Sequence, residues 1–254
     1  MTVKVIALNT FKEAVRDRVL YLLLFFAALA IVLSRVLAVL TVGDRVKVVK
    51  DVGLASVSFF GALMAIMIGT GLVYKEIEKR TIFTLVSKPI RRSEFLLGKY
   101  LGLVLTLGVM LAAMTVIYLG LVFAHTLRFE ARLLLPIAFL FLELILITAV
   151  AILFSCFSTP ILSSLFALSF YLIGHFSWSL ETLIQKTRPG AGRTALQVVY
   201  ALLPDLENFN VKTEVVHGLP IPASLFLTAA GYSLAYTAFV LLLAVLIFRR
   251  RDFV

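Results

Sequence analysis

Six apolar stretches in this chain are each long enough to cross a lipid bilayer as an α-helix, which takes about 20 residues for roughly 30 Å of hydrocarbon. They are Val19–Thr41, Val52–Tyr74, Phe95–Ala124, Leu133–Phe154, Pro160–Leu180 and Ala223–Phe248. Lipid offers no partner for backbone amides, so apolar runs of this length favour helices. They lack the short alternating pattern of a membrane β-barrel. The sequence therefore predicts an all-α polytopic membrane protein with six transmembrane helices.

The composition leaves little chain for a separate soluble domain. Hydrophobic residues make up 61% of the 254 residues and charged residues only 15%, whereas a soluble domain is nearer half apolar and a quarter charged. We therefore expect residues 1–254 to form a single transmembrane domain.

The net charge of +10 is explained by membrane topology, and we expect no nucleic-acid partner. Basic residues concentrate in cytoplasmic loops of membrane proteins. With six spans both termini lie on one side, and that side holds 14 Lys and Arg against 10 on the other. The bias predicts a multi-pass protein of the cytoplasmic (inner) membrane, bacterial or archaeal, with both termini in the cytoplasm.

The N-terminal residues 1–18 have an amphipathic pattern. Apolar side chains recur at near-helical spacing between basic and acidic ones from Val3 to Arg18. This pattern predicts a helix in the membrane interface, with its basic residues toward lipid headgroups. The alternative is a short flank that only orients the first span.

The connection of residues 181–222 is predicted to be extracytoplasmic. Loops longer than about 15 residues are usually functional or disordered, and this one is too apolar to be disordered. Apolar residues at helical spacing in Thr194–Leu203, stopped by Pro204, predict a short helix on the outer leaflet.

No motif for catalysis, nucleotide binding or metal binding is present in the sequence. It has no Gly-x-x-x-x-Gly-Lys-Ser/Thr, His-Glu-x-x-His or Gly-x-Ser-x-Gly motif. The single Cys156 excludes an internal disulfide, and His125, His175 and His217 are far apart and all placed near the outer face. We expect no catalytic residue, metal or cofactor in this chain.

Glu143 is the one carboxylate deep within a predicted span. Such a residue costs about 3 kcal/mol at mid-bilayer on insertion scales, so it should face other helices or water. It either belongs to a substrate path or proton relay, or is a protonated carboxyl bonded to a neighbouring helix. Arg35 cannot be assigned as its partner from the sequence.

The segment Tyr74–Tyr100 contains seven Lys and Arg residues among apolar anchors. Lys88-Pro89 should end a short helix, because the residue before proline disfavours the α region. Ser93 is expected to cap the next long helix, in which Gly98 and Gly102 permit close helix approach. A short amphipathic helix tied to two spans could act as a lever. The alternative is a basic loop that fixes topology and contacts anionic lipid.

Residues 76–102 resemble the signature of the permeases of ABC-2 type transporters. The matching features are an acidic residue, a threonine, a Lys-Pro-x-x-Arg turn and a Leu-Gly-Lys that begins the next helix: Glu76, Thr81, Lys88-Pro89, Arg91 and Leu97-Gly98-Lys99. Arg80 stands where the family often has glycine. The run of residues 203–210 and the terminal Arg249-Arg250-Arg251 are similar to the nitrous-oxide reductase maturation permease group.

The resemblance implies a permease subunit of an exporter that pairs with a second copy as a homodimer and with two separate ATP-binding cassette ATPase subunits. ATP and Mg would bind in those partners. The coupling segment, residues 75–94, would seat in the ATPase, with a second contact at Ser155–Thr159. Its coupling residues would be Glu76, Glu78, Arg80, Thr81, Leu85, Lys88, Pro89, Arg91 and Arg92. The substrate path would be lined mainly by the second and fifth spans and capped outside by residues 181–222.

Two other functions stay open from the sequence. One is a self-contained secondary transporter or channel that uses Glu143 and needs no ATPase. The other is a membrane anchor or assembly factor that transports nothing.

Overall fold

The computed structural model describes residues 2–41, 44–78, 91–187 and 190–250. Every regular element within these ranges is a helix. In chain order they are α1 (Thr2–Val15), α2 (Arg18–Leu40), α3 (Arg45–Glu78), α5 (Arg92–Thr126), η1 (Ala131–Leu133), α6 (Leu134–Ser155), α7 (Pro160–His175), α8 (Ser177–Lys186), α9 (Ala191–Leu202), η2 (Glu207–Phe209), α10 (Lys212–Val216) and α11 (Ala223–Arg250). The predicted all-α class is confirmed.

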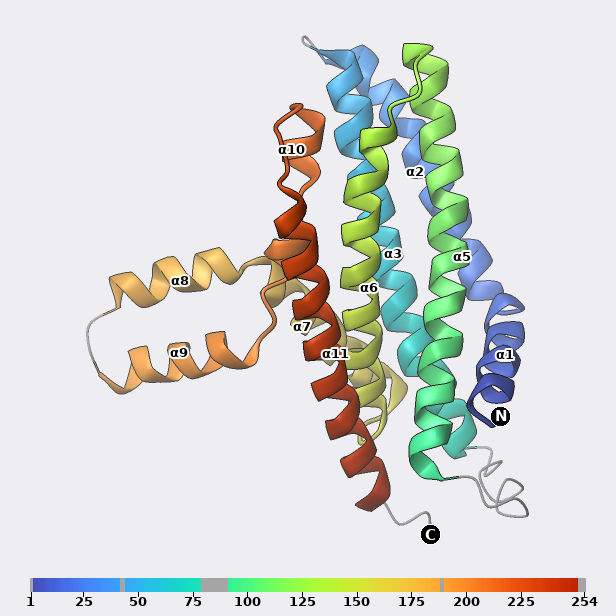
Figure 1. The fold of residues 1–254 in the computed structure, drawn as a ribbon, viewed down its shortest axis with the longest axis vertical. Helices are drawn as coiled ribbons and strands as arrows, with labels where there is room; N and C mark the ends of the chain where they lie inside the picture. The colour runs from blue at the N-terminus through green and yellow to red at the C-terminus, as the bar shows by residue number, and fades with distance from the viewer. Residues whose placement is uncertain (1, 42–43, 79–90, 188–189, 251–254) are drawn as a thin grey trace.

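Five helices within the described ranges are long and apolar enough to span a membrane, namely α2, α3, α5, α6 and α11. The predicted span Pro160–Leu180 differs, because its helix α7 has 16 residues and ends at His175. Backbone N–H of Phe176 still bonds to the carbonyls of Leu172 and Ile173, after which α8 leaves in a new direction (Figure 1). The fifth predicted crossing is therefore interrupted.

Helix α6 forms the centre of the bundle. It packs against α3, α5, α7 and α11. In its most apolar 18-residue stretch 67% is buried, whereas the corresponding stretch of α2 is only 22% buried. Side chains such as Phe139, Leu146 and Ile147 have no exposed surface. Most of the surface of α2 is left for lipid or another protein.

The two ends of the bundle have distinct contents (Figure 1). One end, called the terminal end here, holds α1, the last turn of α11, the end of α3 and the start of α5. The opposite end, called the far end, holds the start of α3 and the connection between α5 and α6.

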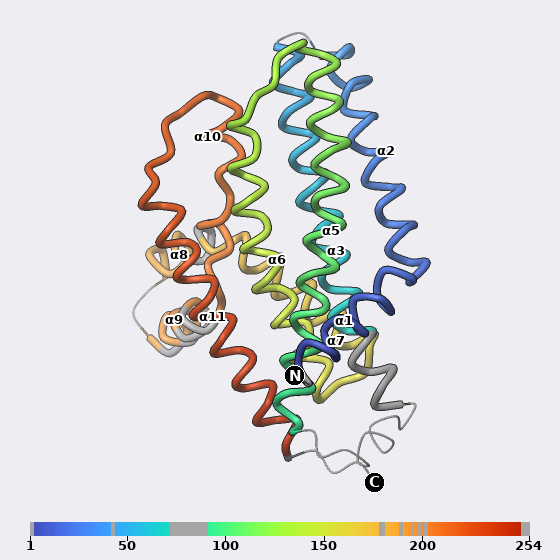
Figure 2. The backbone as a smooth tube through the Cα atoms, turned by 45° about the vertical axis from the view of Figure 1, so that its right-hand side comes forward, coloured from blue at the N-terminus to red at the C-terminus, as the bar shows by residue number. Residues whose placement is uncertain are grey.

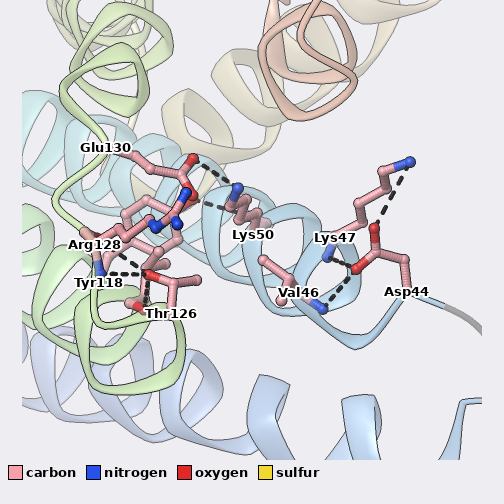
Figure 3. Close-up of polar contacts among 9 residues, drawn as sticks. Asp44, Val46, Lys47, Lys50, Tyr118, Thr126, Arg128 and Glu130 are labelled. Carbon is pink, nitrogen blue, oxygen red and sulfur yellow. Dashed lines mark hydrogen bonds and ion pairs between the residues drawn. The ribbon is translucent and has the colours of Figure 1, made fainter.

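Polar contacts fix the far end (Figure 3). Asp44 Oδ1 accepts from the backbone N–H of Val46 at 3.1 Å and caps the start of α3. One turn later Lys50 Nζ donates to Glu130 Oε2 at 2.6 Å, and Tyr118 Oη donates to the Lys50 carbonyl at 3.3 Å. These contacts join α3 to the α5–α6 connection.

The helices α8 and α9 form a hairpin that projects sideways from the bundle at about half its height (Figures 1 and 2). Its main packing contacts are those between α8 and α9 and those between α8 and α7. The predicted helix Thr194–Leu203 is confirmed as α9, which begins three residues earlier and ends before Pro204. The hairpin leaves the bundle directly after α7 ends at His175.

Candidate functional site

Helix α1 packs directly on the first turns of α5, at the two glycines of the Gly-x-x-x-Gly pattern. A Cβ added to Gly98 would lie 2.7 Å from Ile6 Cβ, and one added to Gly102 would lie 2.5 Å from the Ala7 carbonyl oxygen. Thr10, on the same face of α1, is fully buried. The glycines therefore let α1 lie against α5 in backbone contact, which is the close approach the pattern predicts.

Lys99, between these glycines, is 2% exposed and adds an ionic contact to α1. Its Nζ lies 3.5 Å from Glu13 Oε2 and 5.9 Å from the centre of the Phe95 ring. A buried ammonium needs such partners, because leaving it unpaired out of water is costly. The Leu-Gly-Lys sequence thus has a structural use: its glycine and lysine both hold α1.

The same turns of α5 also hold the end of α11. Arg92 Nη1 donates to the carbonyls of Phe248 at 3.2 Å and Arg249 at 2.9 Å. Phe95 stacks on Phe248 with ring centroids 6.2 Å apart. The last carbonyls of a helix lack intrahelical donors and carry partial negative charge, so a guanidinium there is favourable. We call residues 92–102 with α1 and the end of α11 the junction.

The predicted coupling segment, residues 75–94, overlaps the junction at residues 92–94. Arg91 is exposed and is the N-cap of α5, and its backbone N–H donates to Glu94 Oε2 at 3.4 Å. The prediction that Ser93 caps this helix is wrong, because Ser93 lies within the first turn. The side chains of the other predicted coupling residues fall outside the described part of the chain: Glu76, Glu78, Arg80, Thr81, Leu85, Lys88 and Pro89.

A second group of polar side chains lies inside the bundle, around Glu143. Glu143 is 1% exposed, and its Oε1 lies 2.9 Å from His175 Nε2 at the end of α7. The other ring nitrogen, Nδ1, lies 3.7 Å from Glu207 Oε2. The first contact is within hydrogen-bond distance, and the second is an ion-pair distance if the ring is protonated.

Lys212 completes this group from α10. Its Nζ donates to Ser58 Oγ of α3 at 2.8 Å. We call Glu143, His175, Glu207 and Lys212 the His175 cluster. It joins α6, α7, η2 and α10, with Ser58 as its contact on α3.

The non-helical residues around η2 dock on the end of α7. Leu206 N–H donates to the Gly174 carbonyl at 3.1 Å, and its buried side chain fills the space where a Cβ of Gly174 would lie. Asp205 Oδ1 accepts from Ser177 Oγ at 2.6 Å, and its backbone N–H donates to Tyr232 Oη of α11 at 3.0 Å. These bonds satisfy backbone and side-chain groups that have left regular helix.

Helix geometry places the His175 cluster away from both ends of the bundle. At about 1.5 Å per residue, Glu143 lies roughly 14 Å from the start of α6, and His175 lies roughly 22 Å from the start of α7. The expectation that all three histidines lie near the outer face is therefore wrong for His175, which lies beside Glu143. The sequence left two interpretations of Glu143, one of which is a hydrogen bond to a neighbouring helix. The structure contains such a bond, to the imidazole of His175 on α7.

Sequence reasoning found Glu143 but missed His175, Glu207 and Lys212 as its neighbours. The run of residues 203–210, in which proline and four acidic or amide side chains interrupt an apolar region, could have indicated Glu207. Within the described ranges, no three His, Cys, Asp or Glu side chains converge as a metal site would require.

Comparison with known proteins identifies the family of this chain. No curated protein matches the chain. Residues 4–253 match the family described as ABC-2 family transporter protein. Because this match covers nearly the whole chain, the protein belongs to the ABC-2 transporter family.

Proposed function

We propose that the protein is the permease subunit of an exporter, driven by a separate ATP-binding cassette ATPase that binds residues 75–94. A second copy of the chain would complete the path, with two ATPase subunits binding ATP and Mg. The family assignment supports an ABC transporter permease, and the membrane-spanning helices fit that role. The relation to the nitrous-oxide reductase maturation group stays a prediction.

The junction is the observation that carries this proposal. Arg92 lies within the coupling segment, begins α5 and bonds to the end of α11, and α1 lies in backbone contact with Gly102. A force applied to residues 75–94 would therefore reach α1, α5 and α11 together. Closely packed interiors move as units and transmit strain.

The proposed orientation places the terminal end in the cytoplasm. Exposed basic side chains occur there on α1, on the α1–α2 turn and at the start of α5: Lys4, Lys12, Arg16, Arg18 and Arg91. This agrees with the positive-inside rule and would put the ATPase on the side where ATP is available. Helix α10 would then belong to the outer half, and the α8–α9 hairpin would lie at about mid-height (Figures 1 and 2).

The test is co-purification with the P-loop ATPase, together with ATP hydrolysis by the complex. Arg91→Glu reverses an exposed charge at the edge of the coupling segment and should weaken ATPase binding, more so when combined with Glu76→Arg. Arg128→Glu is the matched control, because Arg128 is also exposed but lies at the far end. Normal assembly and transport in the Glu76→Arg/Arg91→Glu double variant would contradict the proposal.

The His175 cluster keeps the secondary-transporter alternative testable. Glu143, which is buried, and His175, which is partly buried, form a pair of titratable groups inside the bundle, as a proton-driven transporter would require. That alternative expects proton-dependent flux in liposomes that contain this chain alone, abolished by Glu143→Gln. The ABC permease proposal expects no such flux without the ATPase.

A further inference from the structure

We propose that the His175 cluster is a latch that closes the outer side of the transport path, with His175 as its positioning residue. The proposal rests on the permease function and orientation given above. It assigns a role to His175, Glu207 and Lys212, which lie far from the coupling segment.

The chain leaves regular helix after His175, and the segment that returns there could move relative to the end of α7. The chain crosses the inner part as α7, then leaves as the α8–α9 hairpin and returns to the end of α7 at residues 204–211 (Figure 1). Non-helical backbone at membrane depth is tolerated where it is covered by protein or lines a water-filled cavity. In transporters such interrupted helices commonly border the substrate path.

The cluster has a fixed side and a movable side. Glu143 is 1% exposed within the long helix α6, and His175 is 18% exposed at the end of α7. Glu207, by contrast, is 42% exposed and belongs to the three-residue η2, while Lys212 begins the five-residue α10. Short elements have few hydrogen bonds of their own to hold them. Residues 204–216 therefore depend on docking contacts with α7 and α11, such as Leu206 on Gly174 and Asp205 on Tyr232, and they are the side that would move as a unit.

The charges favour the closed state. His175 lies between two carboxylates, and Lys212 is a third contact at Ser58. With the imidazole protonated, the four ionisable groups of the cluster carry no net charge, which limits the cost of burying them. Separating η2 and α10 from α7 and α3 would break the His175–Glu207 and Lys212–Ser58 contacts. It would also break the bonds from Leu206 N–H to the Gly174 carbonyl and from Ser177 to Asp205, while keeping Glu143 with His175. The other ionisable side chain against His175 is Tyr171, whose ring lies 4.6 Å away between centroids.

The latch can be tested without knowing the substrate. The test measures how fast a cysteine introduced at a buried position reacts with a thiol reagent. Ala62 is 2% exposed and lies one turn from Ser58 on the same face of α3. The reporter is Ala62→Cys in a Cys156→Ser background, labelled in intact cells with a membrane-impermeant cationic thiol reagent. His175→Gln and Glu207→Gln should each speed labelling by roughly two- to fivefold, the range expected for the loss of one partly exposed ion pair.

Ser164→Ala is the matched control. Ser164 Oγ lies 2.9 Å from Thr70 Oγ1, so this variant also removes a side-chain hydrogen bond between α7 and α3, but nearer the terminal end. It should leave the labelling rate unchanged. Glu207→Gln keeps the test valid if His175→Gln does not fold, because Glu207 is partly exposed. Unchanged rates in both latch variants, or an equal increase in Ser164→Ala, would overturn the latch.

A second measurement separates the latch from the permease function on which it rests. In the complex with the ATPase, the reporter with an otherwise native latch should be labelled faster when the ATPase is trapped with ATP. Faster labelling in Glu207→Gln with no effect of ATP would mean that the latch exists and that ATP-driven coupling is wrong. Slow labelling in Glu207→Gln with a clear ATP effect would mean the reverse.

Discussion

The contact between α1 and α5 yields a prediction that one methyl group can test. In Gly102→Ala the new Cβ would lie 2.5 Å from the Ala7 carbonyl oxygen and 2.6 Å from Thr10 Cβ. The first distance is about 0.9 Å short of the 3.4 Å at which ordinary contact begins. A backbone oxygen cannot rotate away as a flexible side chain can, so α1 has to move as a unit.

The expected cost is about 1–3 kcal/mol, the usual range for overpacking a close contact. That free energy corresponds to a roughly 5- to 150-fold loss in the ratio of docked to undocked α1. If the strain appears in global stability, the melting temperature falls by about 2–4 °C per kcal/mol for a chain of this size.

Two measurements in lipid nanodiscs check this prediction. Thermal unfolding followed by circular dichroism reports global stability. Thiol labelling of Ala14→Cys, in a Cys156→Ser background, reports release of α1, because Ala14 is 1% exposed on the docked helix. Gly102→Ala should speed that labelling.

Gly120→Ala is the matched control, since Gly120 lies on the same helix and its added Cβ would have no neighbour within 4 Å. Replacing an exposed helical glycine by alanine should be neutral or stabilising by about 0.5–1 kcal/mol. If Gly102→Ala and Gly120→Ala behave alike in both assays, the backbone contact between α1 and α5 is not as described.

Three further variants have expected outcomes. Gly174→Ala, whose Cβ would lie 2.7 Å from Leu206 Cγ, should loosen the non-helical residues from α7 and increase their amide hydrogen exchange by mass spectrometry. Arg92→Gln removes the guanidinium from the last carbonyls of α11, so unfolding stability should fall by about 1–2 kcal/mol, and an unchanged midpoint would contradict this. Glu130→Gln should destabilise the far end by about 1 kcal/mol, because Lys50 is 12% exposed and loses a charged partner at 2.6 Å, whereas Lys50→Met/Glu130→Gln should recover part of that loss.

The sequence located the long helices well and erred where a crossing is interrupted. α2, α3, α5, α6 and α11 all overlap predicted spans, because apolar length is a local property that lipid reads directly. The span Pro160–Leu180 looked equally apolar, yet its helix stops at His175. The stop depends on Leu206 N–H bonding to the Gly174 carbonyl from 32 residues away, which no local pattern encodes.

In the candidate site, too, the sequence indicated some residues, whereas their contacts came only from the structure. Residues 76–102 and Glu143 were recognisable from charge, motif and burial cost. The sequence did not indicate which helix would pack on Gly98 and Gly102, or that Lys99 would pair with Glu13. It also left the partner of Glu143 open, and that partner is His175.

By itself, the sequence determined that this chain forms apolar helices with an amphipathic start and a basic segment between two of them, because transfer to lipid depends on residues within one helix. Only the tertiary structure decided which helices meet. Lipid gives no hydrophobic drive for one pairing over another, so close packing and polar contacts select the partners. Those contacts put α1 on the glycines of α5 and placed His175 between Glu143 and Glu207.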